Sequence, residues 1–202
     1  MASYIVALTG ASGAVYGLRL IEELLKRGDD AELLISPCGF LILEAELGLK
    51  LEGADAAEKI KGYIEGKGLK GIKGGLNYTP SDRLTSKLAS GSSLPKKMVI
   101  CPCSMGTLGR IASGISGNLI ERAADCVLKE RGVLVLVPRE TPLNAIQLEN
   151  MLKLSRAGAV ILPAMPAFYS KPRSIEEMVD FVVGKTLDAL GVENDLYRRW
   201  KG

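Results

Sequence analysis

The sequence predicts one α/β domain over residues 1–202, built on a three-layer, doubly wound parallel sheet of the flavodoxin or Rossmann type. Three observations predict this fold. Short apolar runs of strand length alternate with amphipathic helical segments along the chain. A hydrophobic content of 47% with only 5% aromatic residues is typical of an aliphatic α/β core, and 202 residues can bury one of good size. No segment repeats with a period of about 20–50 residues, so the alternation is not a repeat array.

The first strand and helix lie in residues 4–26. An apolar run at 5–8 predicts a strand, and from Ala14 onward apolar residues recur at three- and four-residue spacing, which predicts a helix. Gly10, Gly13 and Gly17 give GxxGxxxG rather than the dinucleotide pattern GxGxxG. The turn N–H groups and the helix N-terminus could hold a phosphate, and the hydroxyls in this turn favour a phosphomonoester. Glycines kept for packing alone are the alternative.

A second strand is predicted over residues 31–35 and ends at Ser36. Dinucleotide enzymes usually carry an acid there for the ribose, whereas Asp29 and Asp30 lie at the other end of the strand. This counts against NAD. The following helix, over 38–47, carries Glu46 near its end, where a single glutamate is typical of a solvated helix terminus.

Residues 53–75 show the least order. A short polar helix over 54–65 is followed by a Gly/Lys-rich turn region that we expect to end in an edge strand. The small-residue loop at 89–93 is either a flexible connector or a set of anion-facing hydroxyl and N–H groups.

The third strand, over 98–101, is followed by Ser104, Met105, Gly106 and Thr107, which open another helix. Two such loops on neighbouring parallel strands would face one crevice, where ligands bind in open α/β sheets.

A helix over 118–131 places Arg122 and Lys129 seven residues apart on one face. Asp125 could pair with both, so an ordinary surface ion-pair ladder is the alternative. A fourth strand over 133–137 ends in Arg139 and Glu140, a charged pair at the end of a buried strand.

The remaining elements are a helix over 144–156, a strand over 159–162 and a long helix from Ser174 to Leu190. Glu177, three residues after Ser174, predicts a capping box at the start of the last helix, which contains Lys185.

Composition excludes several classes of function. A net charge of +3, from 26 basic and 23 acidic residues, is too balanced to indicate nucleic acid or a membrane surface. No apolar run approaches a membrane span and the first residues enter a strand directly, so we expect a cytoplasmic protein. The chain has no histidine, and two of its four cysteines form CxC, so we expect no metal site and no histidine-based catalysis.

Six blocks together resemble one family. They are TGASG at 9–13, ASGSS at 89–93 with CPCSMGT at 101–107, NLIERAAD at 118–125 with LKER at 128–131, LVPRETP at 136–142, LENMLKL at 148–154 and AVILP at 159–163. Over nearly its full length the chain resembles the UbiX/Pad1 flavin prenyltransferases.

The resemblance implies that the chain joins the dimethylallyl group of dimethylallyl phosphate to N5 and C6 of reduced FMN. The product, prenylated FMN, would serve a UbiD-type decarboxylase. It also implies a homo-oligomer, typically a dodecamer, with sites at subunit interfaces.

The resemblance assigns roles to residues that match the family's motifs. It implies that Glu46, Lys129 and Glu140 act in catalysis. The implied FMN-binding residues are Gly10, Ala11, Ser12, Ser36, Ser104, Met105, Gly106, Thr107 and Arg139. The implied prenyl-phosphate residues are Ser90, Gly91, Arg122, Lys129, Arg139, Glu140, Tyr169 and Lys185, with Trp200 as an aromatic residue near the flavin.

One residue departs from the family. Lys185 stands where the family often has arginine, so the charge stays but the bidentate guanidinium fork is lost. The chain also lacks the Asp-rich DDxxD segment with which prenyl diphosphate enzymes hold Mg²⁺. A phosphate bound by arginine, lysine and hydroxyl groups needs no metal ion, and an allylic cation would be stabilised over the electron-rich flavin.

Three other functions fit parts of this pattern. FMN-dependent cysteine decarboxylases of the phosphopantothenoylcysteine type rely on a histidine, which this chain lacks. A non-catalytic FMN carrier would leave Arg122, Lys129, Glu140 and Lys185 without a role. A direct aromatic-acid decarboxylase would release CO₂ without a partner. The sequence leaves open the choice between monophosphate and diphosphate, and the pathway that the partner serves.

Overall fold

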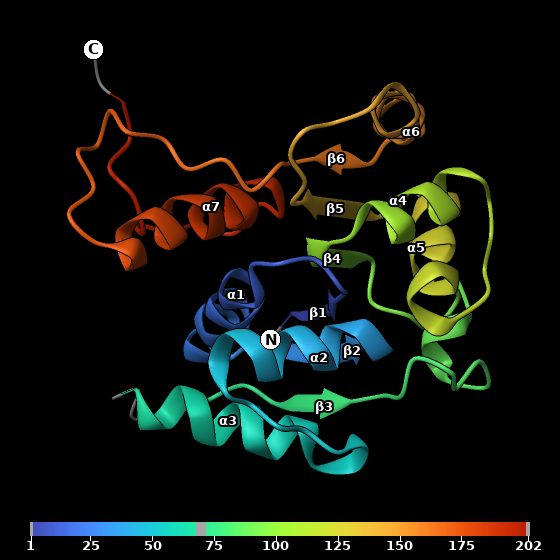
Figure 1. The fold of residues 1–202 in the computed structure, drawn as a ribbon. Helices are drawn as coiled ribbons and strands as arrows, with labels where there is room; N and C mark the ends of the chain where they lie inside the picture. The colour runs from blue at the N-terminus through green and yellow to red at the C-terminus, as the bar shows by residue number, and fades with distance from the viewer. Residues whose placement is uncertain (1, 68–71, 201–202) are drawn as a thin grey trace.

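Six parallel strands form a single sheet in the order β3-β2-β1-β4-β5-β6 (Figure 1). The computed structural model describes residues 2–67 and 72–200. The strands are β1 (Ser3–Leu8), β2 (Asp30–Ile35), β3 (Leu76–Tyr78), β4 (Lys97–Cys103), β5 (Val133–Pro138) and β6 (Val160–Ile161). This is the strand order of doubly wound nucleotide-binding sheets. From β1 the chain adds strands toward one edge of the sheet, as far as β3, and then returns to add β4 on the other side of β1. The predicted three-layer parallel sheet is confirmed.

Helices cover both faces of the sheet. One face carries α1 (Ala14–Lys26), α2 (Pro37–Leu47), α3 (Ala56–Gly66) and α7 (Ile175–Ala189). The other carries α4 (Met105–Ala112), α5 (Leu119–Lys129) and α6 (Ala145–Arg156). Two short 3₁₀ turns, η1 (Gly53–Asp55) and η2 (Lys87–Ala89), lie in the connections. Two apolar clusters, one on each side of the sheet, therefore form the core.

The alternation of side chains along β1 explains why the central strands read as unbroken apolar runs. Val6 and Leu8 pack toward α1 and α7, whereas Ile5 and Ala7 pack toward α4 and α5. All four are buried. Because successive side chains point to opposite faces and both faces are covered, every position of the strand must be apolar.

The edges of the sheet follow the expectation. β3 pairs with β2 and is the predicted edge strand after the Gly/Lys-rich region, of which residues 68–71 lie outside the described part. At the other edge, β6 is only two residues long and Val160 is exposed. No helix among the described residues is long and apolar enough to cross a membrane.

The capping of α7 differs in one bond from the prediction. Ser174 Oγ accepts a hydrogen bond from the N–H of Glu177 at 3.3 Å, as expected. The Glu177 carboxylate, however, accepts from the N–H of Arg173 at 2.7 Å rather than from that of Ser174. The start of α7 is therefore stabilised by two side-chain-to-backbone hydrogen bonds, although they do not form a capping box.

Candidate functional site

Three of the predicted flavin-binding segments meet at one edge of the sheet. Gly10–Ser12 follow β1, Ser36 follows β2, and Ser104–Thr107 follow β4. The three strands are neighbours and run in the same direction, so their carboxyl ends lie together. We call the space between these segments the strand-end crevice. The neighbouring strands bring the starts of the three segments together as expected, and a shared ligand crevice stays a prediction.

Thr9 connects two of these loops. Its hydroxyl accepts a hydrogen bond from the N–H of Ser104 at 2.7 Å and donates one to the carbonyl of Pro102 at 2.8 Å. The side chain is almost fully buried, with 1% of its surface exposed. The first and third loops are therefore fixed relative to each other by one hydroxyl, a role that the sequence analysis did not assign.

The strand-end crevice presents backbone donors. Ser36 and Ser104 are the N-caps of α2 and α4, where their hydroxyls accept from Gly39 N–H at 3.0 Å and Thr107 N–H at 3.3 Å. Within the described chain, the N–H groups of Met105 and Gly106 at the start of α4 have no hydrogen-bond partner. Free N–H groups at a helix N-terminus are suited to bind an anion.

The three glycines of the GxxGxxxG pattern, of which Gly17 lies inside α1, are each required by the backbone conformation or by close packing. Gly13 has φ 110°, a left-handed conformation that disfavours other residues. A Cβ on Gly10 would collide with the Cys38 side chain, and one on Gly17 would collide with the Cys101 carbonyl oxygen. Packing and backbone conformation therefore explain the GxxGxxxG pattern. A ligand in the strand-end crevice is indicated instead by the free N–H groups of Met105 and Gly106.

Glu46 is exposed near the end of α2, as expected of a solvated helix terminus, and it also caps the start of α1. Its carboxylate accepts hydrogen bonds from the N–H of Gly13 at 3.0 Å and of Ala14 at 2.9 Å. A carboxylate at the N-terminus of α1 is favoured by the helix dipole. The sequence suggested that N–H groups at the start of α1 bind a phosphate. In the structure two of these N–H groups, those of Gly13 and Ala14, bind the Glu46 carboxylate instead.

A cationic group lies along α5. Arg122 Nε donates to the carbonyl of Ala89 at 3.1 Å, which ties α5 to the small-residue loop of Ser90. A Cβ on Gly91 would lie 2.8 Å from Lys129 Nζ, so the lysine head packs directly over this glycine. The structure therefore brings together four of the predicted prenyl-phosphate residues: Ser90, Gly91, Arg122 and Lys129.

The ion-pair ladder considered for α5 is only half formed. Arg122 pairs with Asp125 at 2.7 Å, but Lys129 pairs with Glu130 at 2.9 Å rather than with Asp125. Glu130 raises the pKa of Lys129, and Lys129 lowers the pKa of Glu130. Lys129 is consequently fully protonated at neutral pH.

Arg139 and Glu140 lie at the end of β5 in a cavity of about 230 Å³. Met151 of α6 and Met165 of the segment after β6 also line it. Arg139 Nε is buried and has no hydrogen-bond partner within the described chain. A buried guanidinium N–H without an acceptor is costly, so this group indicates a ligand or a neighbouring chain at this place.

Tyr169, Lys185 and Trp200 form a third group near the C-terminus. The rings of Tyr169 and Trp200 meet edge to face, with centroids 5.5 Å apart. Lys185 lies on α7 with its Nζ 5.9 Å from the centre of the Tyr197 ring. All three predicted residues are exposed.

The predicted prenyl-phosphate residues are therefore divided between the two faces of the sheet. Arg122 and Lys129 lie on α5, which packs on the same face as α4 and α6. Lys185 lies on α7, which packs on the opposite face with α1. Figure 1 shows α5 and α7 on opposite sides of the sheet. Within one chain these cations do not form a single pocket.

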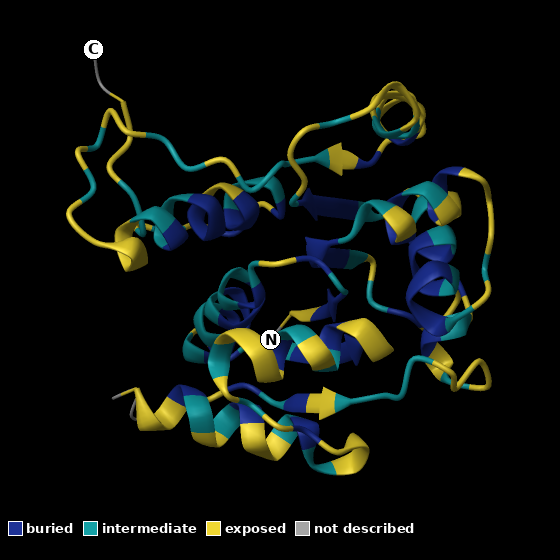
Figure 2. Ribbon diagram, viewed as in Figure 1, coloured by how far each residue is buried: buried dark blue, intermediate teal, exposed yellow. Residues whose placement is uncertain are grey.

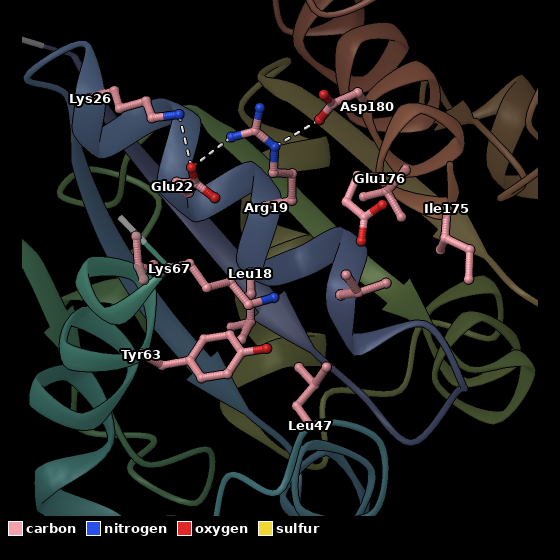
Figure 3. Close-up of a pocket in the computed structure, with 13 residues that line it drawn as sticks. Leu18, Arg19, Glu22, Lys26, Leu47, Tyr63, Lys67, Ile175, Glu176 and Asp180 are labelled. Carbon is pink, nitrogen blue, oxygen red and sulfur yellow. Dashed lines mark hydrogen bonds and ion pairs between the residues drawn. The ribbon is translucent and has the colours of Figure 1, made fainter. Parts of the chain in front are cut away.

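A larger cavity, of about 320 Å³, lies elsewhere, between α1, α3 and α7 (Figure 3). It contains none of the predicted site residues. Four of its charged groups pair with one another: Arg19 contacts Glu22 at 2.8 Å and Asp180 at 2.7 Å, and Lys26 contacts Glu22 at 2.8 Å. The larger of the two cavities therefore does not coincide with the residues that the sequence predicts for the site.

Two of the four cysteines are not placed for thiol chemistry. Cys101 and Cys103 are buried in the core, and burial raises the pKa of both thiols, that of Cys103 to about 12. They are thus protonated and unreactive at neutral pH. Over residues 2–67 and 72–200, no three Cys, Asp or Glu side chains gather in a way that could hold a metal ion.

Comparison with known proteins gives a consistent result. The model of the family described as Flavoprotein matches residues 2–187. The flavin prenyltransferase UbiX of Halalkalibacterium halodurans is 48% identical over 197 residues, which cover 98% of this chain and 92% of that protein. The UbiX of Pseudomonas aeruginosa is 47% identical over 195 residues, covering 96% and 92%.

The fold is shared with a solved structure that holds FMN and a prenyl diphosphate. The crystal structure of AnUbiX (PadA1) in complex with FMN and dimethylallyl pyrophosphate matches with a TM-score of 0.86 and 35% identity, covering 100% of this chain and 98% of that one.

Proposed function

Because the chain belongs to the Flavoprotein family and, within it, to the UbiX flavin prenyltransferases, we propose that it joins the dimethylallyl group of dimethylallyl phosphate to N5 and C6 of reduced FMN. We further propose that the reaction needs no metal ion, that it takes place in the cytoplasm, and that a UbiD-type decarboxylase receives the prenylated FMN.

The strand-end crevice carries this proposal. It offers the unpaired N–H groups of Met105 and Gly106, and Arg139 Nε is buried without an acceptor at the end of the next strand. These donors suit a ligand that carries both a phosphate and a ring system with acceptor atoms, and FMN has both. Reduced FMN supplies an electron-rich ring whose N5 and C6 can form bonds to the allylic unit.

The chain's own residues would act on the leaving phosphate. Lys129, Arg122 and Lys185 are cations that can neutralise the charge that develops on the phosphate as its bond to the allylic carbon breaks. Glu140, exposed at the end of β5, can exchange a proton with the departing phosphate. Glu46, which holds the first loop, is the carboxylate nearest to the start of α1 and is our candidate for further proton handling there.

We propose that a second copy of the chain completes the prenyl-phosphate pocket, because the cations lie on opposite faces of one subunit. The outer helices support an assembly. Ile146, Leu148 and Leu152 of α6 are 51–69% exposed, and in Figure 2 this helix is mostly yellow and teal. Exposed apolar groups of this number on one helix are typical of an interface. A solved structure with a TM-score of 0.85 and 36% identity, covering 99% of this chain and all of that one, is a dodecameric FMN-dependent UbiX-like decarboxylase from Escherichia coli O157:H7.

Mixing two inactive variants tests this shared site. Lys129→Ala and Lys185→Ala subunits, unfolded and co-assembled, should regain prenyl transfer, since a fraction of the sites then combines an intact Lys129 with an intact Lys185. If both lysines act from the same chain, no site in the mixture has both and the activity stays at the level of the separate variants.

The name of the Escherichia coli structure also supports a second candidate, direct decarboxylation of an aromatic acid on bound FMN. The two functions differ in their products: prenyl transfer alters the flavin, whereas decarboxylation releases CO₂ from the acid. Purified protein is incubated with reduced FMN and dimethylallyl phosphate, and separately with FMN and an aromatic acid. The proposed function predicts an altered flavin in the first sample and no CO₂ in the second, and the opposite pattern supports the decarboxylase.

A further inference from the structure

The segment that follows α7 folds back along that helix. Gly191, with φ 67°, reverses the chain, and the N–H of Val192 bonds to the carbonyl of Leu187 at 2.9 Å. We call residues 192–200 the hook. In Figure 1 the hook, in red, passes beside the orange segment that leads into α7.

Asp188 of α7 holds the hook with both carboxylate oxygens. Oδ2 accepts from the Tyr197 hydroxyl at 2.6 Å and from Arg199 Nη1 at 3.0 Å. Oδ1 accepts from Arg199 Nη2 at 2.7 Å and from Asn194 Nδ2 at 2.9 Å. Arg199 lowers the pKa of Asp188, and burial together with the Asp188 hydrogen bond raises the pKa of Tyr197 to about 12. A bidentate, charge-assisted contact of this kind is geometrically specific.

The helix is shaped to receive the hook. A Cβ on Gly184 would lie 2.5 Å from Tyr197 Cδ1 and 2.9 Å from Asn194 Oδ1. Any larger residue at this position would push the Tyr197 ring away from α7. The bare backbone of Gly184 thus lets the hook dock closely.

The docked hook contacts two of the candidate substrate residues. The Tyr197 ring lies 5.0 Å from Phe181 and 5.9 Å from Lys185 Nζ, a cation–π distance. At the end of the hook, Trp200 meets Tyr169 edge to face, and Tyr169 also meets Phe181 at 6.0 Å. Lys185 and Tyr169 are therefore both oriented by aromatic rings that the hook supplies or secures.

We propose that the hook is a positioning device for the prenyl-phosphate half of the site, with Asp188 as the residue that locks it in place. Asp188, Tyr197 and Gly184 act through Lys185 and Tyr169 and do not touch the substrate themselves. The inference rests on the proposed function, since it assigns a purpose to residues that would hold dimethylallyl phosphate.

The test uses three variants and one matched control. Asp188→Asn removes the charge that holds Arg199, Tyr197→Phe removes one hydrogen bond and keeps the ring, and Gly184→Ala displaces the hook without changing any charge. Asp195→Asn makes the same chemical change as Asp188→Asn at an exposed hook residue that has no recorded partner within the described chain. Thermal unfolding of each variant identifies any that does not fold.

Two readouts report on docking without any catalysis. Trp200 is the only tryptophan of the chain, so the anisotropy of tryptophan fluorescence measures how freely the hook moves. Trypsin cleaves after Arg198 and Arg199 when the hook leaves α7. We expect tryptic cleavage to rise and the anisotropy to fall in Asp188→Asn and Gly184→Ala, both less in Tyr197→Phe, and neither in Asp195→Asn.

Function is measured as the KM for dimethylallyl phosphate beside the affinity for FMN. In Asp188→Asn and Gly184→Ala we expect the KM to rise by about tenfold or more while FMN affinity is unchanged. A general loss of structure would weaken FMN binding as well, so the split between the two constants is diagnostic.

Three outcomes would overturn the inference. If Asp188→Asn leaves the tryptophan anisotropy and the rate of tryptic cleavage as in the wild type, Asp188 does not lock the hook. If the hook is released but the KM is unchanged, it does not position the site, although the proposed function stands. If the wild-type protein binds no dimethylallyl phosphate, the proposed function fails and the positioning role fails with it.

Discussion

Thr9 and Ser104 join the two loops of the strand-end crevice through a single hydrogen bond of 2.7 Å, from the backbone N–H of Ser104 to the hydroxyl of Thr9. Thr9 follows β1 and Ser104 begins the loop after β4, 95 residues later in the chain. The same hydroxyl donates a hydrogen bond to the carbonyl of Pro102, so both of these hydrogen bonds are to backbone groups of the protein. The shape of the crevice therefore depends on a side chain that need not touch a ligand.

Replacing Thr9 with valine tests this connection. The isosteric side chain removes the hydroxyl and leaves a buried N–H unpaired, which should lower the free energy of unfolding by about 1–3 kcal/mol. FMN affinity should fall by about tenfold because the two loops lose their fixed spacing. Thr9→Ser, which keeps the hydroxyl, is the control. Denaturant unfolding measures the free energy of unfolding, and FMN titration measures the affinity for FMN. Tight FMN binding by Thr9→Val would show that the loops are positioned without this bond.

Glu46 should have a structural effect that is separable from any catalytic one. Glu46→Ala removes the carboxylate from the N–H groups of Gly13 and Ala14 and should lower the free energy of unfolding by about 1 kcal/mol. Glu46→Gln keeps an acceptor and should be less destabilised. If Glu46 also handles protons, Glu46→Gln will lose prenyl transfer at nearly unchanged stability. Full activity in Glu46→Gln restricts the residue to its capping role.

Lys129→Ala and Glu140→Gln should reduce prenyl transfer far more than FMN binding. Loss of one contact to developing charge commonly lowers the rate by about 10²–10³-fold. Single-turnover prenylation of reduced FMN, measured beside FMN titration, provides both numbers.

The controls for these two variants lie on α3. Lys59→Ala breaks an exposed pair with Asp55, and Glu58→Gln changes an exposed carboxylate in the same helix. Both should be silent. Near wild-type rates for Lys129→Ala and Glu140→Gln at saturating dimethylallyl phosphate would remove these residues from the mechanism.

Thiol reactivity at pH 8 should single out Cys38. Cys38 is exposed beside Ser36 and Gly10, whereas the other three cysteines are buried. Burial raises the pKa of Cys101, Cys103 and Cys126, so these thiols stay protonated until the pH approaches their raised pKa values. We expect one thiol per chain to react quickly with an aromatic disulfide reagent, and bound FMN to slow that reaction. Cys38→Ser should abolish the fast phase. Equal rates with and without FMN would place the flavin away from α2.

The sequence predicted the fold well for physical reasons that are visible in single residues. Each central strand is buried on both faces, as Ile5 and Val6 show, so it reads as an apolar run. The helices that pack on such strands keep a strict apolar spacing. The elements therefore follow from local patterns, and strand bounds differed by only one or two residues.

The site was less predictable because its connections span the chain. Nothing local indicates that Glu46 reaches Gly13, 33 residues away, or that Thr9 reaches Ser104. The serine hydroxyls at Ser36 and Ser104 were expected to face a ligand, but each also caps its own helix. The division of the cations between two faces of the sheet depends on topology and could not be read from spacing.

The most direct measurement of the central claim is the mass of the flavin recovered from the protein. Purified protein is incubated without oxygen with reduced FMN and dimethylallyl phosphate in the presence of EDTA, and the flavin is then released and weighed by mass spectrometry. A UbiX-type flavin prenyltransferase that needs no metal ion will yield FMN heavier by one five-carbon prenyl unit. Recovery of unmodified FMN, with or without added Mg²⁺, would contradict the proposed function. A prenylated product formed only when Mg²⁺ is added would contradict the metal-free phosphate pocket alone.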